Sequence, residues 1–68
     1  MNQVKIKKSV YTIKESGIME NGKRFFILLK GKTEKTLCAG TSSYSLWGKD
    51  AANRTTMTVH SLNSINFI

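Results

Sequence analysis

The chain has no proline, and only one cysteine and one histidine occur among its 68 residues. A single cysteine, Cys38, cannot form an internal disulfide, which excludes the disulfide-stapled mini-domains of secreted proteins. A zinc site needs about four protein ligands, or three with a water molecule, and this composition cannot supply them. The longest apolar run, Phe25 to Leu29, is far too short to cross a bilayer. We therefore expect no metal, no cofactor and no contact with a membrane.

Signals for secretion and for catalysis are also missing. The basic segment 1–8 is not followed by an apolar h-region, so it does not predict a signal peptide, and we expect a cytoplasmic protein. Cys38, His60 and Asp50 are residue types of a nucleophilic triad, but Cys38 lies in an apolar segment where a small buried residue is usual. Gly48-Lys49 lacks the rest of a phosphate loop. We expect no enzymatic activity.

Acidic residues are scarce, since four Asp and Glu oppose eleven Lys and Arg and the formal net charge is +7. Nine of the eleven cations lie in the first half of the chain, up to Lys35, where only three glutamates oppose them. Solubility alone does not require charges of one sign, so the asymmetry favours a surface that binds a polyanion. The alternative is a solvated strand surface whose lysines prevent aggregation at sheet edges.

The length of the chain predicts one small domain that spans residues 1–68. A chain of this size buries only about 60% of the surface of its unfolded state, so its stability is marginal. Association of two copies is a common remedy, because a partner subunit supplies the missing buried area. A monomer and a homodimer both stay open at this point.

Alternation of apolar and polar residues predicts strands over most of the chain. Val4 and Ile6 share one face of a first strand, and the alternation slips by one residue before Tyr11 and Ile13. Such a slip is typical of a β-bulge or a sharp bend within one strand. Asn21-Gly22 predicts a type I′ turn that closes a hairpin. Further strands are predicted over residues 23–30, 36–39, 55–60 and 65–68.

Two segments shape the expected fold class. Residues 23–30 are apolar on both faces, which predicts a central strand or a strand with one face against a partner. Residues 41–54 show no alternation, and a serine there is suited to cap a short helix, although Gly48 weakens it. The chain is therefore predicted to be all-β, with or without one short helix. We expect a small five-stranded OB-like barrel or a strongly twisted antiparallel sheet.

One group of residues in the first third of the chain carries a family resemblance: Val4 and Ile6, Ser9, Ile13-Lys14, Ser16-Gly17-Ile18, and Gly22-Lys23 followed by Phe25. With these residues the segment resembles the small single-stranded-DNA-binding, or helix-destabilising, proteins of filamentous phages. The resemblance implies an OB-like dimer whose first strand leads into a DNA-binding wing. It would place Lys23 and Arg24 in the wing and an aromatic residue at Phe25. Residues 33–54 do not match, and the chain is shorter than the family.

The leading hypothesis is a non-enzymatic protein that binds single-stranded DNA or RNA, with lysines on phosphates and exposed rings stacked on bases. Phe26 is favoured as a stacking ring over Phe25, because Phe26 shares a strand face with Lys30. The hydroxyl of Tyr11 favours a position at the surface. Other candidate rings are Tyr44 and Trp47. The predicted nucleic-acid-binding residues are Lys5, Lys7, Tyr11, Lys14, Lys23, Arg24, Phe26, Lys30 and Lys32.

The alternative function is that of a small phage-type inhibitor or interaction module, for example a counter-defence protein. Such a protein would dock through a sheet edge or an apolar patch onto a host protein that handles nucleic acid. Binding to short single-stranded and duplex oligonucleotides at two salt concentrations distinguishes the two hypotheses.

Overall fold

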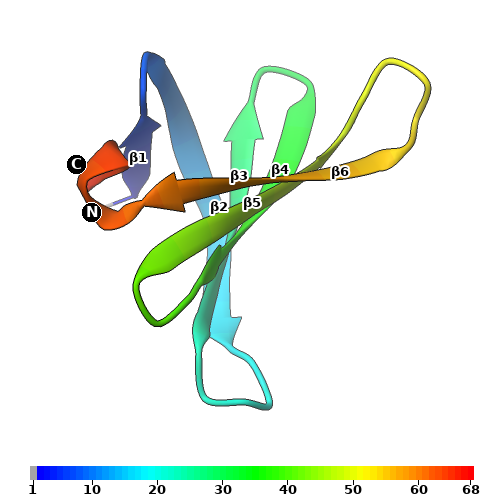
Figure 1. Cartoon of the computed structure of the whole chain (residues 1–68). Helices are drawn as coiled ribbons and strands as arrows, with labels where there is room; N and C mark the ends of the chain where they lie inside the picture. The colour runs from blue at the N-terminus through cyan, green and yellow to red at the C-terminus, as the bar shows by residue number, and fades with distance from the viewer. Residues whose placement is uncertain (1) are drawn as a thin grey trace.

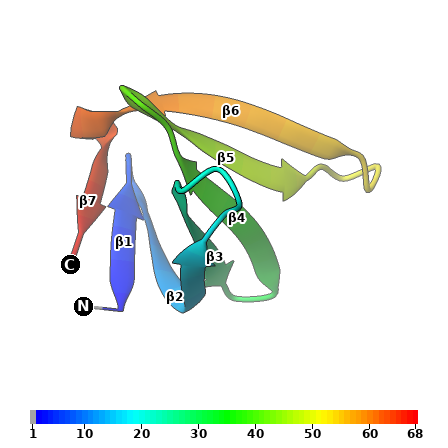
Figure 2. The ribbon, with the colours of Figure 1, turned by 90° about the horizontal axis from the view of Figure 1, so that it is seen from below.

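The computed structural model describes residues 2–68 and contains one antiparallel sheet of seven strands. The elements in chain order are β1 (Gln3–Ile6), β2 (Ser9–Ile18), β3 (Arg24–Lys30), β4 (Thr33–Ala39), β5 (Ser43–Lys49), β6 (Thr55–Ser61), the 3-10 helix η1 (Leu62–Ser64) and β7 (Ile65–Phe67). The chain is drawn in Figure 1, and the spatial order of its strands is β6-β5-β4-β3-β2-β1-β7. β7 therefore returns to pair with β1 (Figure 2). Among the residues described, no helix is long and apolar enough to cross a membrane.

The sheet curls strongly and forms a half-barrel, with β6 at one edge and β7 at the other (Figure 2). Its concave face encloses the core. Leu37 lies directly opposite Leu46 on the neighbouring strand, and both are buried. The all-β fold and the twisted antiparallel sheet are therefore confirmed, with seven strands instead of five. The buried apolar side chains are Val4, Ile6, Tyr11, Leu28, Leu37, Leu46 and Ile65.

β3 occupies the middle of the sheet, as its two apolar faces predicted. Leu28 points to the concave face and is fully buried, and Phe26 shares that face because side chains alternate along a strand. Phe25 and Ile27 point to the convex face, where they are only half-buried. β3 is therefore covered by the chain itself on one side only.

The slip of the alternation near residue 8 is a turn and not a bend within one strand. Ile6 pairs with Ser9, and Lys7 connects the two strands with a positive φ of 55°. A bulge does occur, but later, between Ile13 and Glu15. It moves the concave side chains of β2 from odd positions to even ones. A turn and a bulge both shift the alternation of apolar and polar residues by one position. Because lysine is not a residue that favours turns, the sequence could not distinguish a turn from a bulge here.

The hairpin between β2 and β3 closes at Asn21-Gly22, but not through a type I′ turn. Met19 donates its backbone N–H to the carbonyl of Lys23 at 2.7 Å, and Gly22 donates to the carbonyl of Met19 at 2.8 Å. Gly22 alone has a positive φ, 85°, while the side chain of Asn21 accepts a bond from the N–H of Lys23. This is the three-residue hairpin loop in which a turn is followed by one left-handed residue.

Residues 41–54, for which a short helix and an irregular segment both stayed open, form β5 and a second loop of the same kind. Asp50 donates its N–H to the carbonyl of Arg54 at 3.0 Å, and Asn53 takes the left-handed position with a φ of 62°. The carboxylate of Asp50 also accepts bonds from the N–H groups of Ala52 and Arg54, both at 2.9 Å. An aspartate that binds nearby backbone N–H groups favours such a loop over a helix.

Replacing Gly22 by Val should destabilise the protein. A Cβ at this position meets no other heavy atom within 4 Å, so the cost arises from the φ of 85° and not from a clash. We expect a loss of about 1–3 kcal/mol, seen as a lower melting temperature by circular dichroism. Gly22→Asn is the matched control and should lose less, because Asn tolerates left-handed backbone better. Equal melting temperatures for G22V and the wild type would contradict this assignment of the loop.

Candidate nucleic-acid interface

In the part of the chain that the structure describes, the concave face of the sheet carries cations but no carboxylate, whereas the convex face carries both. Strand alternation places Arg24, Lys30 and Lys35 on the concave face, on the same side as Leu28 and Leu37. No carboxylate lies on the concave face in residues 2–68, because the acidic residues occupy either the convex face or a hairpin loop. The convex ones are Glu15 and Glu34, and those in loops are Glu20 and Asp50.

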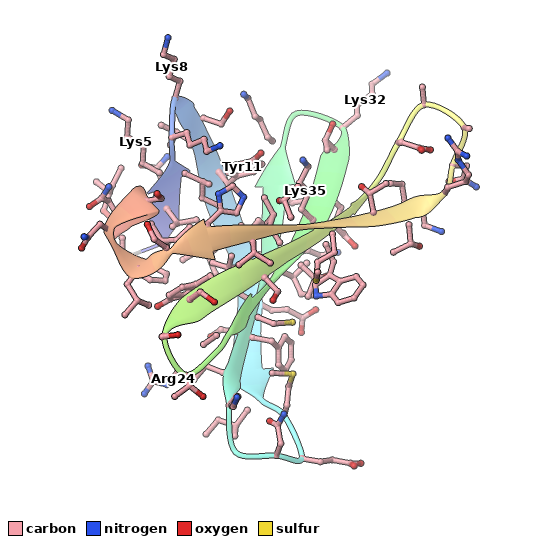
Figure 3. All side chains as sticks on the ribbon, viewed as in Figure 1. Lys5, Lys8, Tyr11, Arg24, Lys32 and Lys35 are labelled. Carbon is pink, nitrogen blue, oxygen red and sulfur yellow. The ribbon has the colours of Figure 1, made fainter. Side chains whose placement is uncertain are left out.

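Lysines gather at one end of the half-barrel. The turns β1–β2, β3–β4 and β5–β6 all lie at this end, because consecutive strands are antiparallel (Figure 1). Lys8 and Lys32 extend from it, while Arg24 lies at the opposite end (Figure 3). We refer to this cluster as the basic end. Its members are Lys7, Lys8, Lys30, Lys32, Lys35 and Lys49.

The carboxylates nearest to the basic end are paired with other cations. Glu34 lies 3.5 Å from the ammonium of Lys14, and Asp50 lies 3.2 Å from Nε of Arg54. These are the ion pairs found within residues 2–68, and none of them includes a lysine of the basic end. Exposed pairs of this kind add little stability. Their consequence here is that the charge of the basic end is not neutralised by the neighbouring acids.

Packing fixes two of these lysines over the concave face. Lys30 donates from Nζ to Oγ of Ser9 at 3.1 Å and lies 5.9 Å from the ring centroid of Tyr11. The stem of Lys35 lies across Gly48, where a Cβ would come within 3.1 Å of its Cγ. Because Gly48 has no side chain, Lys35 can lie flat against β5. Both ammonium groups are thereby directed along the inside of the sheet.

His60 is a buried residue whose pKa is affected by two lysines of the basic end. Its ring is only 9% exposed, and Nε2 lies 2.9 Å from Oγ1 of Thr58. Burial lowers the pKa of His60 below its ordinary value, and the positive charges of Lys7 and Lys35 lower it further. The imidazole is therefore neutral at pH 7.

A hollow of about 540 Å³ opens beside the basic end, between the β3–β4 turn and the β5–β6 loop. Trp47 lines it and is 41% exposed, which is unusual for so large an apolar ring. Lys32 and Lys49 line the same hollow. Its hydrogen-bonding side chains are those of Thr33, Glu34, Thr36, Asn53 and Thr55. The hollow lies on the convex face, where Glu34, Thr36 and Trp47 point, and it combines a stacking surface with two lysines, hydrogen-bonding groups and one carboxylate.

A second, smaller hollow of about 350 Å³ lies on the concave face toward the opposite end. Phe26 and Arg24 line it together with Phe67. The rings of Phe26 and Phe67 are tilted, with centroids 5.1 Å apart. Part of the Phe26 ring thus borders this hollow while the rest packs against the core.

No family model, curated protein or solved structure matches this chain. The chemistry of the basic end and of the two hollows is therefore inferred from the residues of this chain alone.

The residues predicted to bind nucleic acid fall into separate groups. Lys7, Lys30 and Lys32 belong to the basic end, and Arg24 and Phe26 meet in the second hollow. The others lie apart from both groups. Lys5 and Lys14 lie on the convex side, Lys14 paired with Glu34, and Lys23 lies in the β2–β3 loop, where its Nζ donates to Oγ1 of Thr41 at 3.4 Å.

The expectation that Tyr11 lies at the surface is wrong, because the residue is 6% exposed and belongs to the core. Its position inside the curled sheet is visible in Figure 3. A tyrosine in a narrow half-barrel can bury its ring while its hydroxyl points toward the open end. The presence of a hydroxyl therefore does not predict an exposed ring.

Lys8, Lys35 and Lys49 were absent from the predicted set, and Trp47 was named only as a further candidate ring. The signal for Trp47 and Lys49 is the alternation of β5, in which Leu46 is buried and Trp47 is exposed. Gly48 interrupts the alternation of apolar and polar residues, so the sequence did not predict a strand in this segment. Assigned as a strand, it places Trp47 and Lys49 on one face.

The predicted roles of Phe25 and Phe26 are exchanged in the structure. Phe26 packs against the buried cluster, whereas Phe25 lies on the convex face over Gly17. Phe26→Ala should therefore cost more stability, up to about 3 kcal/mol, because a cavity forms beside the core. Phe25→Ala is the matched control and should cost less in urea unfolding. A larger loss for F25A than for F26A would contradict the assigned faces.

Stability should decrease as the pH falls below about 6.5, the pKa of an unfolded histidine. The lowered pKa of His60 means that the folded state binds fewer protons than the unfolded state in this range, so acid favours unfolding. Melting temperatures at pH 7.5 and 5.5 measure the effect. His60→Gln, which keeps a polar group near Thr58, should flatten the dependence. The same slope in both proteins would rule out His60 as its source.

Proposed function

We propose that this protein binds single-stranded nucleic acid at its basic end and catalyses no reaction. The observation that supports this most is the exposed indole of Trp47 in an open hollow that Lys32 and Lys49 also line. A base would stack on the indole, and the two ammonium groups would contact the flanking phosphates. Asn53 lies in the same hollow and offers an amide to a base edge.

The shape of the hollow favours a single strand over a duplex. A ring can stack only on a base that is not already stacked, and the bases of a duplex expose only their edges in the grooves. The volume of about 540 Å³ lies within the range of roughly 300–1,000 Å³ that is usual for small-molecule sites, so a nucleotide fits. Lys30 and Lys35 point to the concave face, so they would contact only phosphates that pass around the end of the sheet.

The β2–β3 hairpin is a separate part of this proposal. The resemblance to filamentous-phage single-stranded-DNA-binding proteins would give Lys23 and Arg24 the role of a wing. In this chain the hairpin projects from the end opposite to the basic end (Figure 1). Arg24 points to the concave face and Trp47 to the convex face, so a strand that contacts both would have to cross from one face of the sheet to the other. Arg24→Ala should then weaken binding to long oligonucleotides more than to short ones.

Trp47 is the only tryptophan of the chain, so its fluorescence reports the proposed contact directly. Titration with short oligo(dT) or oligo(U) should quench the emission, because a base stacks on the indole. In a parallel anisotropy titration, Trp47→Ala should weaken binding by about 1–3 kcal/mol. Anisotropy changes without any quenching would place the nucleic acid elsewhere on the protein.

Salt dependence tests the role of the lysines. The slope of log affinity against log salt changes by about 0.7 for each phosphate contact on a single strand. Lys32→Ala and Lys49→Ala should each reduce the slope by about that amount. Lys5→Ala is the matched control, since it removes the same charge from the convex side of β1. Equal slopes for all three variants would indicate a diffuse charge effect instead of a site.

The absence of binding to single-stranded and duplex DNA and RNA at low salt would contradict the proposal. It would favour the alternative, a small inhibitor that docks onto a host protein. The structural support for that alternative is the convex face, where apolar side chains remain accessible to solvent. They are Phe25, Ile27, Leu29, Trp47, Met57 and Val59.

A further inference from the structure

β6 leaves one long edge of the sheet unpaired, because it is the last strand in the spatial order. The bond from the N–H of Asp50 to the carbonyl of Arg54 identifies these two residues as a hydrogen-bonded pair, and so determines which residues of β6 bond to β5. In an antiparallel pair, alternate residues bond to the neighbouring strand. Thr56, Thr58 and His60 therefore bond to β5. The residues that direct their backbone groups outward are Thr55, Met57, Val59 and Ser61.

This edge lacks the features that normally prevent association. Proteins protect exposed edges with charges, prolines, bulges or very short strands. β6 has seven residues without a charge or a proline, and its register with β5 has no bulge. Val59 is 62% exposed and Met57 is 45% exposed. The opposite edge, β7, has only three residues and is protected by its shortness.

We propose that β6 pairs antiparallel with β6 of a second copy, with the twofold axis at Thr58. In this register Met57 faces Val59 of the partner subunit, and Thr55 faces Ser61 of the partner subunit. All outward backbone groups of the strand then lie in hydrogen-bonded pairs. A shift by one residue would place outward groups opposite inward ones, and a shift by two would leave an end of the strand unpaired.

The side chains of β6 are complementary to themselves in this register. On the convex face, Met57 of each copy contacts Val59 of the partner subunit, next to Trp47 on β5. On the concave face, Thr58 faces Thr58 of the partner subunit across the axis. No charged side chain of β6 is brought near another, because the strand has none. Such apolar and β-branched cross-strand pairs stabilise antiparallel sheets.

The net charge of +7 on each copy does not oppose this arrangement. The basic end lies at the Thr55 end of β6, and antiparallel pairing places the two Thr55 residues about 20 Å apart along the strands. This separation exceeds the Debye length of about 8 Å at physiological salt, so repulsion between the basic ends is screened. The joined sheet therefore carries one basic end at each extremity of its central strand pair.

The exposed area of the chain also fits a dimer. The surface accessible to solvent is 4931 Å² for a mass of 7.6 kDa. Folded monomers of this mass expose about 4,300 Å², so each copy has an excess of about 600 Å². If the two copies cover this additional surface on each other, the interface buries about 1,200 Å² in total, which is the lower limit for a stable interface. The proposal does not depend on the binding of nucleic acid.

Sedimentation equilibrium of the full chain, free of nucleic acid, tests the association. The wild type should show twice the monomer mass. Val59→Lys should raise the dissociation constant at least tenfold, because it brings a charge onto the pairing edge. Thr12→Lys is the matched control, since it adds the same charge at an exposed position of β2 within the sheet, and should change the constant less than twofold. A monomer at all concentrations, or a dimer that V59K does not weaken, would overturn the proposal.

Disulfide cross-linking tests the register. Residues that face each other in a non-hydrogen-bonded pair have Cα atoms about 4.5 Å apart, which is within disulfide range. In a Cys38→Ser background, Thr58→Cys should form a covalent dimer on mild oxidation. Thr56→Cys should not, because it faces His60 of the partner subunit. Cross-linking of T56C at the rate of T58C, or none for T58C in a sample that sediments as a dimer, would refute the register.

Discussion

The structure depends on one constraint: a single short sheet must curl so that it covers its own apolar face. No second layer is present among residues 2–68, so the concave face has to close over Leu28, Leu37 and Leu46. The right-handed twist of the strands and the bulge in β2 produce the necessary curl. β7 completes the enclosure, since Phe67 reaches the rings of Phe26 and Tyr44 across the half-barrel.

This constraint has a second consequence, because a sheet that closes on one face leaves the other face open. The convex face keeps Trp47, Met57 and Val59 accessible, and the β6 edge keeps its backbone groups unpaired. The antiparallel order of the strands places three hairpin turns at one end, where lysines from distant parts of the sequence lie. The proposed nucleic-acid site therefore uses the end of the sheet where the three turns lie. The proposed dimer uses the unpaired edge of β6.

The features that could be predicted from the sequence are those with a local signal. Alternation predicted the strands around Val4, Leu28 and Val59, and the apolar composition of residues 23–30 predicted the central strand. The face of β3 that carries Phe26 could not be assigned, because both faces are apolar and only the direction of the curl distinguishes them. The interface was only partly predictable, because its lysines and Trp47 come together through the order of the strands and not through spacing in the sequence.

Chemical-shift mapping by NMR during titration with a short single-stranded oligonucleotide locates the bound nucleic acid on the protein. The largest amide shifts should fall in residues 30–35 and 47–55, around the hollow that Trp47 lines. The side-chain indole N–H of Trp47 should shift with them. Shifts confined to the β2–β3 hairpin and the hollow beside Phe26, or no shifts at low salt, would contradict the claim that the basic end is the binding site.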